Sequence, residues 1–189
     1  LPRLRAIFSL GAGVDAMLRD PTLPDLPLCR MVDPSLTATM AEYVLACVLW
    51  YHRQFDLYAR QQAERRWKLD LPAPAAATRI GVMAGSDILV CLLPLTAETE
   101  NILDAALFAR LPEGARLIQV GRGRQLVEAD LLAALESGRL AHATLDVVRE
   151  EPLPPAHPFW THPKIRLTPH TASYCQPATG AAIVAENIL

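Results

Sequence analysis

The sequence predicts an α/β protein built on a doubly wound parallel sheet. Short apolar runs alternate with helical segments through the second half of the chain, and these runs are apolar at successive positions instead of at every second one. Polar residues follow several of the runs directly. Strands that are apolar on both faces are typical of a parallel sheet covered by helices on each side.

The first third of the chain predicts a strand, an irregular connection and a long helix. Residues 6–10, AIFSL, form an apolar run that ends in Gly-Ala-Gly, which suits a buried strand leading into a tight loop. The stretch from Pro21 to Pro34 holds four prolines and is expected to be irregular. Thr39 to Glu42 spells a capping box, and apolar residues then recur at helical spacing as far as Arg66.

A Pro/Ala segment, residues 71–78, is the best candidate for a domain boundary. Beyond it we expect five strands, at residues 79–83, 87–93, 116–120, 142–148 and 165–168. Helices are expected near 104–110 and 128–138, the second of them ending at Gly138, a residue that favours the C-terminal end of a helix.

Composition and charge exclude several classes of partner. The formal net charge of -2 and the dispersed arginines favour neither nucleic acid nor an anionic membrane surface, and no apolar run reaches the length of about 18 residues that a membrane span needs. The 4 cysteines lack CxxC spacing, so we expect a reducing, cytoplasmic location and no metal site. A small-molecule partner is therefore favoured.

Both ends of the sequence have the character of interior segments. The first residues enter a strand-like run almost at once, and the last residues, GAAIVAENIL, end inside a helical pattern without a stop signal. We therefore expect a longer protein at both ends.

Three polar residues follow three consecutive predicted strands. Arg122 lies in VGRGR, Glu151 in LDVVREEPLP and His170 in TPHTAS. Each alone has an ordinary interpretation, as a solvated arginine, a surface carboxylate or a structural histidine. Ligands of doubly wound proteins bind at the carboxyl ends of the strands, however, and a guanidinium suits a planar carboxylate. A histidine with a carboxylate partner is a common device for moving a proton near pH 7.

Six motifs in order along the chain resemble those of the D-2-hydroxyacid dehydrogenases, and the last two, together with LGAGVD, are most similar to the glyoxylate/hydroxypyruvate reductase branch. The motifs are GAGVD (11–15), AEYVLACVL (41–49), LLPLTAET (92–99), VGRGRQLVEADLLAALESG (120–138), TLDVVREEPLPPAHPFWTHPKI (144–165) and TPHTAS (168–173). They cover nearly the whole chain. One mild departure is Gln119, which stands where many members carry Asn.

The resemblance implies a function and a set of site residues. It implies reduction of glyoxylate- or hydroxypyruvate-type 2-keto acids to D-2-hydroxy acids with NADPH or NADH. Arg122, Glu151 and His170 would be the catalytic residues, Arg122 holding the keto acid, His170 protonating the ketone oxygen and Glu151 pairing with His170. Ala12, Gly13 and Arg122 would bind the substrate. The cofactor would be bound by Leu93, Pro94, Thr99, Val120, Gly121 and Asp146, with Asp146 facing the nicotinamide carboxamide.

The resemblance also implies a domain organisation. Residues 1–36 would be the remnant of a flavodoxin-like substrate domain, residues 37–70 a long linking helix, and residues 71–170 a Rossmann-like dinucleotide-binding domain. Residues 171–189 would form a C-terminal helix that returns to the substrate domain. The family usually forms homodimers, so a homodimer is expected here.

The chain departs from the family between Met83 and Asp87. The family has there a GxGxxG turn, its helix and a further strand, a unit of roughly 30 residues or more, whereas this sequence has only Ala84-Gly85-Ser86. Either the protein lacks this unit, or the sequence omits a segment that the complete chain contains. We favour the second, since a sheet without the unit would expose apolar surface.

Two other functions stay open on the sequence. A dinucleotide-sensing binding protein, similar to the corepressors that share this fold, would use the site for regulation without turnover. An inactive pseudoenzyme is favoured by the missing turn and disfavoured by the presence of Arg122, Glu151 and His170. The three polar residues together favour the enzyme.

Overall fold

The structure is a computed structural model that describes residues 4–81, 85–173, 181, 183 and 185. The chain divides into two compact units, one of Leu1–Tyr43 with Ala172–Leu189 and the other of Val44–Thr171. The division falls within a helix and not in the Pro/Ala segment. Most of the expected C-terminal helix, and Val82 to Ala84 at the departure from the family, lie outside the described residues.

The first unit contains a two-stranded parallel sheet. Strand β1 (Ile7–Phe8) pairs with β2 (Leu28–Cys29), and a short helix, α1 (Asp15–Leu18), lies between them in the sequence. The prediction for the proline-rich stretch was wrong at β2, because its residues between Pro27 and Arg30 pair with the strand that the apolar run AIFSL forms.

Helix α2 (Pro34–His52) begins before the predicted capping box. Asp33 starts it: its Oδ1 accepts a hydrogen bond from the Ser35 amide at 2.8 Å, and Pro34 occupies the first turn, where a missing N–H costs nothing. Thr39 lies inside the helix and its hydroxyl donates to the Ser35 carbonyl at 2.9 Å. The capping-box prediction was therefore wrong.

The long helix expected as far as Arg66 is two helices. Gln54 adopts a left-handed conformation, φ 58°, and α3 (Phe55–Ala63) begins directly after it. No glycine or proline marks this break in the sequence. In the described part of the chain, neither α2 nor any other helix is long and apolar enough to cross a membrane.

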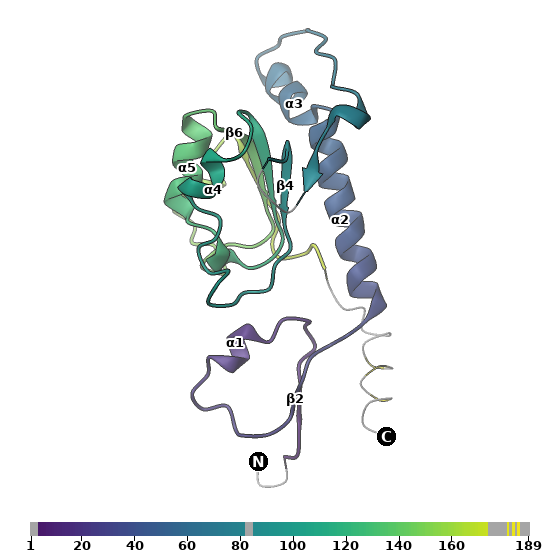
Figure 1. Ribbon diagram of the computed structural model, residues 1–189, viewed down its shortest axis with the longest axis vertical. Coiled ribbons are helices and arrows are strands. Elements are labelled where there is room, and N and C mark those ends of the chain that lie inside the picture. The colour runs from purple at the N-terminus through teal and green to yellow at the C-terminus, as the bar shows by residue number, and fades with distance from the viewer. Residues whose placement is uncertain (1–3, 82–84, 174–180, 182, 184, 186–189) are drawn as a thin grey trace. The chain divides into compact units, whose positions relative to one another are not determined.

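The second unit contains the predicted parallel sheet (Figure 1). Its strands follow one another in the order β3 (Ile80–Gly81), β4 (Ile88–Cys91), β5 (Ala115–Gln119), β6 (Leu140–Leu145) and β7 (Ile165–Leu167), and every pair is parallel. This confirms the doubly wound α/β prediction.

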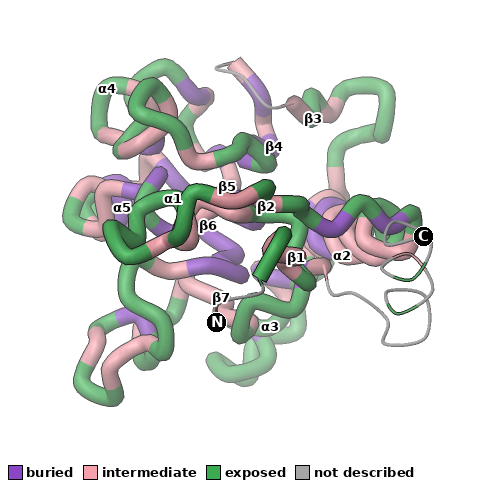
Figure 2. Tube along the Cα trace, turned by 90° about the horizontal axis from the view of Figure 1, so that it is seen from below, coloured by how far each residue is buried: buried purple, intermediate pink, exposed green. Residues whose placement is uncertain are grey.

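One face of this sheet is packed against α4 (Ala105–Ala109) and α5 (Glu128–Glu136), as Figure 1 shows. The central strands are buried along most of their length (Figure 2), and the core is apolar, with Leu117, Leu131 and Leu145 wholly excluded from solvent. Gly138, φ 80°, follows α5 as predicted. Three short 3-10 helices, Ala75–Ala77, Gly123–Gln125 and Pro158–Trp160, lie in connections.

The other face carries a buried polar cluster. The Tyr51 hydroxyl at the end of α2 lies 3.0 Å from Nδ1 of His142 and 2.6 Å from Oγ1 of Thr144, both on β6. Beside them Arg116 of β5 donates from Nε to the buried Asp56 carboxylate at 3.1 Å. Burial, opposed in part by the Asp56 charge, lowers the pKa of His142 from 6.5 to about 4.

This burial predicts a loss of stability in mild acid. Between pH 6.5 and pH 4 the unfolded chain binds a proton at residue 142 that the folded chain does not, so the free energy of unfolding falls as the pH falls. From pH 7 to pH 5 the loss at this residue should be about 2 kcal/mol. Urea denaturation at both pH values should show a smaller loss for His142→Gln than for the parent. Equal losses in the two proteins would rule out His142 as the source.

Candidate active site

The predicted site residues of the second unit lie at one edge of the sheet. Because all five strands are parallel, their carboxyl ends meet at that edge, where ligands of such sheets bind. The loops that begin there carry Leu93 and Pro94 after β4, Val120, Gly121 and Arg122 after β5, Asp146 and Glu151 after β6, and His170 after β7.

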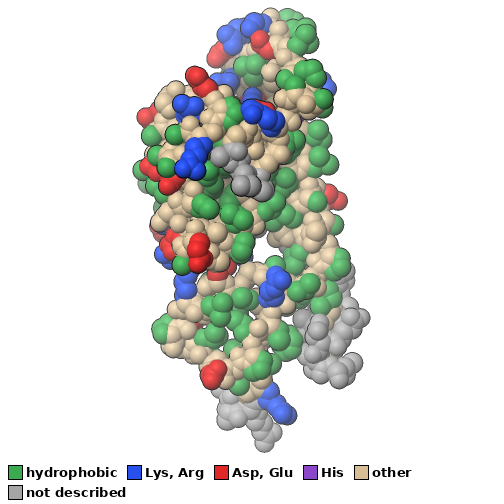
Figure 3. Space-filling model, viewed as in Figure 1, with side chains coloured by type: hydrophobic (Ala, Val, Ile, Leu, Met, Phe, Trp, Pro, Cys, Tyr) green, Lys and Arg blue, Asp and Glu red, His purple; other side chains and the backbone are tan. Residues whose placement is uncertain are grey.

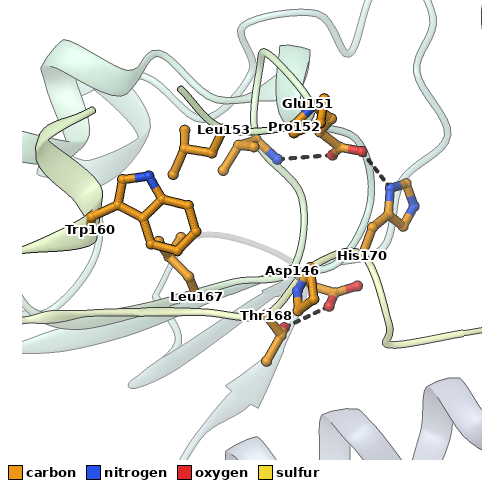
Figure 4. A pocket seen from close by; sticks show the side chains of 10 residues that line it. Asp146, Glu151, Pro152, Leu153, Trp160, Leu167, Thr168 and His170 are labelled. Carbon is orange, nitrogen blue, oxygen red and sulfur yellow. Dashed lines mark hydrogen bonds and ion pairs between the residues drawn. The ribbon is translucent and has the colours of Figure 1, made fainter. Parts of the chain in front are cut away.

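Glu151 and His170 form a hydrogen-bonded pair, as the sequence predicted. Nδ1 of His170 lies 2.8 Å from Oε2 of Glu151, and the other carboxylate oxygen of Glu151 accepts from the Val148 amide at 3.1 Å (Figure 4). The His170 side chain is 44% exposed. Glu151 therefore fixes the ring through Nδ1, and Nε2 on the far side of the ring is the atom suited to a ligand.

The backbone of His170 is held by the loop after β6. His170 adopts a left-handed conformation, φ 54°, and its amide donates to the Asp146 carbonyl at 2.8 Å. The Asp146 carboxylate is buried; its Oδ1 accepts from the Thr168 hydroxyl at 2.6 Å and from the Thr171 amide at 2.8 Å. Asp146 thus binds the residues on both sides of His170, and its predicted contact with the nicotinamide carboxamide stays a prediction.

Arg122 lies at the end of the neighbouring strand, β5, and is half-buried. Its Nη1 donates to the Gly121 carbonyl at 2.8 Å, and its backbone amide donates to Oε1 of Gln125 at 2.8 Å. The structure therefore places Arg122 at the same edge as the Glu151–His170 pair, on a turn held by side chains from within the unit.

Two glycines make this turn possible by their lack of a side chain. A Cβ on Gly121 would lie 2.3 Å from Oε1 of Gln125, and a Cβ on Gly123 would lie 1.8 Å from the Val148 carbonyl oxygen. Real Cβ atoms do not approach so closely, so both positions require glycine.

The residues predicted to bind the cofactor differ in their exposure and in their hydrogen bonds. Leu93 and Pro94 are exposed beyond β4, whereas Val120 is buried and its amide donates to the Cys91 carbonyl at 3.1 Å. The Thr99 hydroxyl donates to the Pro94 carbonyl at 2.6 Å and accepts from the Thr96 amide at 2.7 Å, so it supports the fold of its own loop. Their roles toward a cofactor stay predictions.

A pocket of about 560 Å³ opens beside the Glu151–His170 pair. In Figure 4 the pair forms one side of it, and Trp160, Leu153 and Leu167 lie across from the histidine. The catalytic candidates therefore border an apolar cavity.

Ala12 and Gly13 lie in the first unit, in an exposed loop between β1 and α1. Their predicted contact with a substrate carboxylate stays a prediction.

The described residues fit the nicotinamide end of a dinucleotide better than its pyrophosphate. Strand β3 pairs directly with β4, and only six positions separate Gly81 from Ile88, whereas a crossover between parallel strands takes a dozen residues or more when it contains a helix. The glycine-rich turn and the helix N-terminus that bind pyrophosphate therefore have no counterpart in this sequence. The strand ends from β4 to β7, which would face the nicotinamide, are present.

The sequence interpretation missed Gln125, Thr168 and Thr171. Gln125 is wholly buried and binds Arg122, and the two threonines bind Asp146. Gln119 could be recognised from the sequence as a polar residue within the apolar run RLIQV. Nothing in the sequence distinguishes Gln125 from a solvated loop residue.

An arginine and a carboxylate-bound histidine at the carboxyl edge of a parallel sheet, where such sheets bind their ligands, fit the active site of an α/β dehydrogenase. The chain belongs to the D-isomer specific 2-hydroxyacid dehydrogenase family, since the sequence model for the NAD-binding domain of that family matches residues 57–172. This confirms the resemblance found in the sequence.

Curated relatives place the chain beside one branch of the family. It is 38% identical to glyoxylate/hydroxypyruvate reductase A of Serratia proteamaculans, over 99% of this chain and 76% of the relative. It is 36% identical to the protein of the same name from Yersinia enterocolitica, with 98% and 76% covered. The Serratia alignment extends over 239 residues although this chain has 189, so roughly 50 of its positions hold no residue of this chain.

Solved structures agree with these relatives. A D-isomer specific 2-hydroxyacid dehydrogenase from Xanthobacter autotrophicus Py2, in complex with NADPH and MES, superposes with a TM-score of 0.93 at 38% identity, covering 99% of this chain and 74% of that one. An NADPH-dependent glyoxylate/hydroxypyruvate reductase from Sinorhizobium meliloti, in complex with NADP and sulfate, gives 0.88 at 32% identity, covering 99% and 74%.

Proposed function

We propose that this protein reduces glyoxylate- and hydroxypyruvate-type 2-keto acids to D-2-hydroxy acids with NADPH or NADH. The observation that carries the proposal is the 2.8 Å bond between His170 and Glu151, at the same sheet edge as Arg122. The names of the curated relatives and the NADPH-bound structural relatives support it.

Each residue has a separate task in this reaction. The Arg122 guanidinium binds the carboxylate and the 2-keto oxygen of the substrate, which fixes the plane of the keto acid. His170 donates a proton from Nε2 to the ketone oxygen, while Glu151 keeps the ring oriented through Nδ1. The nicotinamide, when bound, supplies the hydride that reduces C2. The proton and the hydride together convert the ketone to an alcohol.

Replacing Arg122 with lysine tests the proposal. The charge is kept, but an ammonium cannot form two parallel bonds to a planar group, so kcat/KM for glyoxylate should fall by about tenfold or more, or at least 1.4 kcal/mol. NADPH consumption measures the rate. Arg124→Lys is the matched control, because Arg124 is exposed on the same turn and binds Glu100 at 2.7 Å. A loss under about threefold at Arg122, on the order of 0.6 kcal/mol, would remove it from the mechanism.

The domain assignment follows from the same proposal. We assign residues 71–170 to the dinucleotide-binding domain, incomplete between 83 and 87, and residues 1–36 to the remnant of the substrate domain. Residues 37–70 link the two, and residues 171–189 return to the substrate domain. The end of the family match at residue 172 and the grouping of Ala172–Leu189 with the first unit support the C-terminal boundary, whereas the family match begins within the linking segment, at residue 57.

We also propose a cytoplasmic homodimer. Leu45 and Leu49 of α2 are exposed, as is Phe55 at the start of α3, and Figure 3 shows hydrophobic side chains along the surface of α2. Such an apolar surface favours association with a second copy. Cys47 and Cys91 are buried, where a reduced thiol packs as a small apolar side chain, and this supports a reducing location.

A further inference from the structure

The backbone of Arg122 is bound from both sides by buried amide side chains. Oε1 of Gln125 accepts from the Arg122 amide at 2.8 Å, and Nε2 of Gln119 donates to the Arg122 carbonyl at 2.9 Å. Both glutamines are fully buried. Glutamine is a mostly exposed residue type, so two wholly buried glutamines around the backbone of one residue are unusual.

The two amides are joined to each other and to the loop after β4. Nε2 of Gln119 lies 3.3 Å from Oε1 of Gln125, and Oε1 of Gln119 accepts from the Gly121 amide at 3.3 Å. Nε2 of Gln125 donates to the carbonyls of Leu93 and Pro94, at 2.8 and 3.1 Å. The turn that carries Arg122 and the Leu93–Pro94 loop are therefore connected through one side chain.

Ordering this network costs side-chain entropy, on the order of 1.5–2 kcal/mol for each glutamine. An apolar residue of similar volume would fill the same space but would remove the partners of the backbone groups that the amides bind. A buried polar network whose members all find partners does, however, hold its backbone in one conformation. Gly121 contributes by leaving room for Oε1 of Gln125.

We infer that Gln119 and Gln125 are positioning residues that hold Arg122 in the orientation in which it binds the 2-keto acid. The inference rests on the proposed role of Arg122. Neither glutamine touches the substrate. Both act through the backbone of Arg122, and Gln125 also links that backbone to the Leu93–Pro94 loop.

The test compares Gln125→Met with Gln125→Glu. Methionine has a similar length and no hydrogen-bonding amide, so the KM for glyoxylate should rise about tenfold or more, with a smaller change in kcat. Glutamate keeps an acceptor for the Arg122 amide but, when ionised, cannot donate to Leu93 or Pro94. Its KM relative to the parent should therefore improve as the pH falls and the carboxyl group gains a proton.

A second readout does not depend on turnover. Hydrogen exchange of the Arg122 backbone amide, followed by NMR, should accelerate about tenfold or more in Gln125→Met, because its acceptor is gone. Gln61→Met is the matched control: Gln61 is also buried, but it lies on α3 and its Nε2 donates to the Asp70 carboxylate at 2.7 Å. Should Gln125→Met fail to fold, Gln119→Met removes the donor to the Arg122 carbonyl, and it should raise the KM in the same direction.

Parent-like KM and Arg122 exchange in the folded variants would overturn the inference, as would equal effects of Gln61→Met and Gln125→Met. The proposed function fails differently. If Arg122→Lys leaves keto acid reduction unchanged, the role of Arg122 is wrong, whereas a damaging Arg122→Lys with a neutral Gln125→Met refutes only the positioning role.

Discussion

Replacing His170 with alanine should lower the rate of keto acid reduction by about 10²–10⁴-fold, the usual contribution of a general acid. The loss should appear in kcat, because the imidazole acts on the ketone oxygen during reduction. NADPH affinity, measured by fluorescence titration, should stay within about twofold, since the change removes no charge that the cofactor needs.

Two carboxylates in the loop after β6 extend this prediction, one as a second test and one as its control. Glu151→Gln removes the anion that binds Nδ1 of His170 and should slow the reaction, whereas Glu150→Gln alters an exposed neighbour and should not. Turnover by His170→Ala at the parent rate near neutral pH would show that another group supplies the proton.

The second large effect concerns the cofactor. The chain should bind NADPH about 10²–10⁴-fold more weakly than its relatives do, because two or more charge-assisted bonds to the pyrophosphate, about 1.5–3 kcal/mol each, have no donors here. Reduced nicotinamide mononucleotide lacks the adenylate half. Calorimetry should therefore give it nearly the same affinity as NADPH for this chain.

A chimera sharpens this test. Inserting a unit with the GxGxxG turn and helix expected of the family between Met83 and Asp87 should tighten NADPH binding by the same factor and leave the mononucleotide unaffected. The control chimera has valine in place of the first glycine of the inserted turn. Micromolar NADPH binding by the unaltered chain would contradict the prediction, because other groups would then hold the pyrophosphate.

The sheet was predictable from the sequence because its strands are buried on both faces. The runs around Leu89, Leu117 and Leu145 are apolar at successive positions, and such a pattern has few structural solutions. Helix boundaries were less predictable. Asp33 and Thr39 are both acceptable caps, and only the tertiary structure shows that Asp33 is used.

The site was predictable only in part. Arg122, Glu151 and His170 follow strands, so the topology places them at one edge, and the Glu151–His170 bond confirms the predicted pairing. The break at Gln54 and the contacts of Gln125 depend on residues distant in sequence or on a backbone conformation that no local motif marks. The spacing of apolar residues therefore predicts neither the break at Gln54 nor the contacts of Gln125.

The close approach of Gly123 to Val148 links the turn of Arg122 to the loop of Glu151. The Val148 carbonyl rests against the Gly123 backbone, and the Val148 amide binds Glu151. A side chain at position 123 would push the two loops apart, and an insertion in either would do the same. A change in the length of one of these loops must therefore be matched by a change in the other.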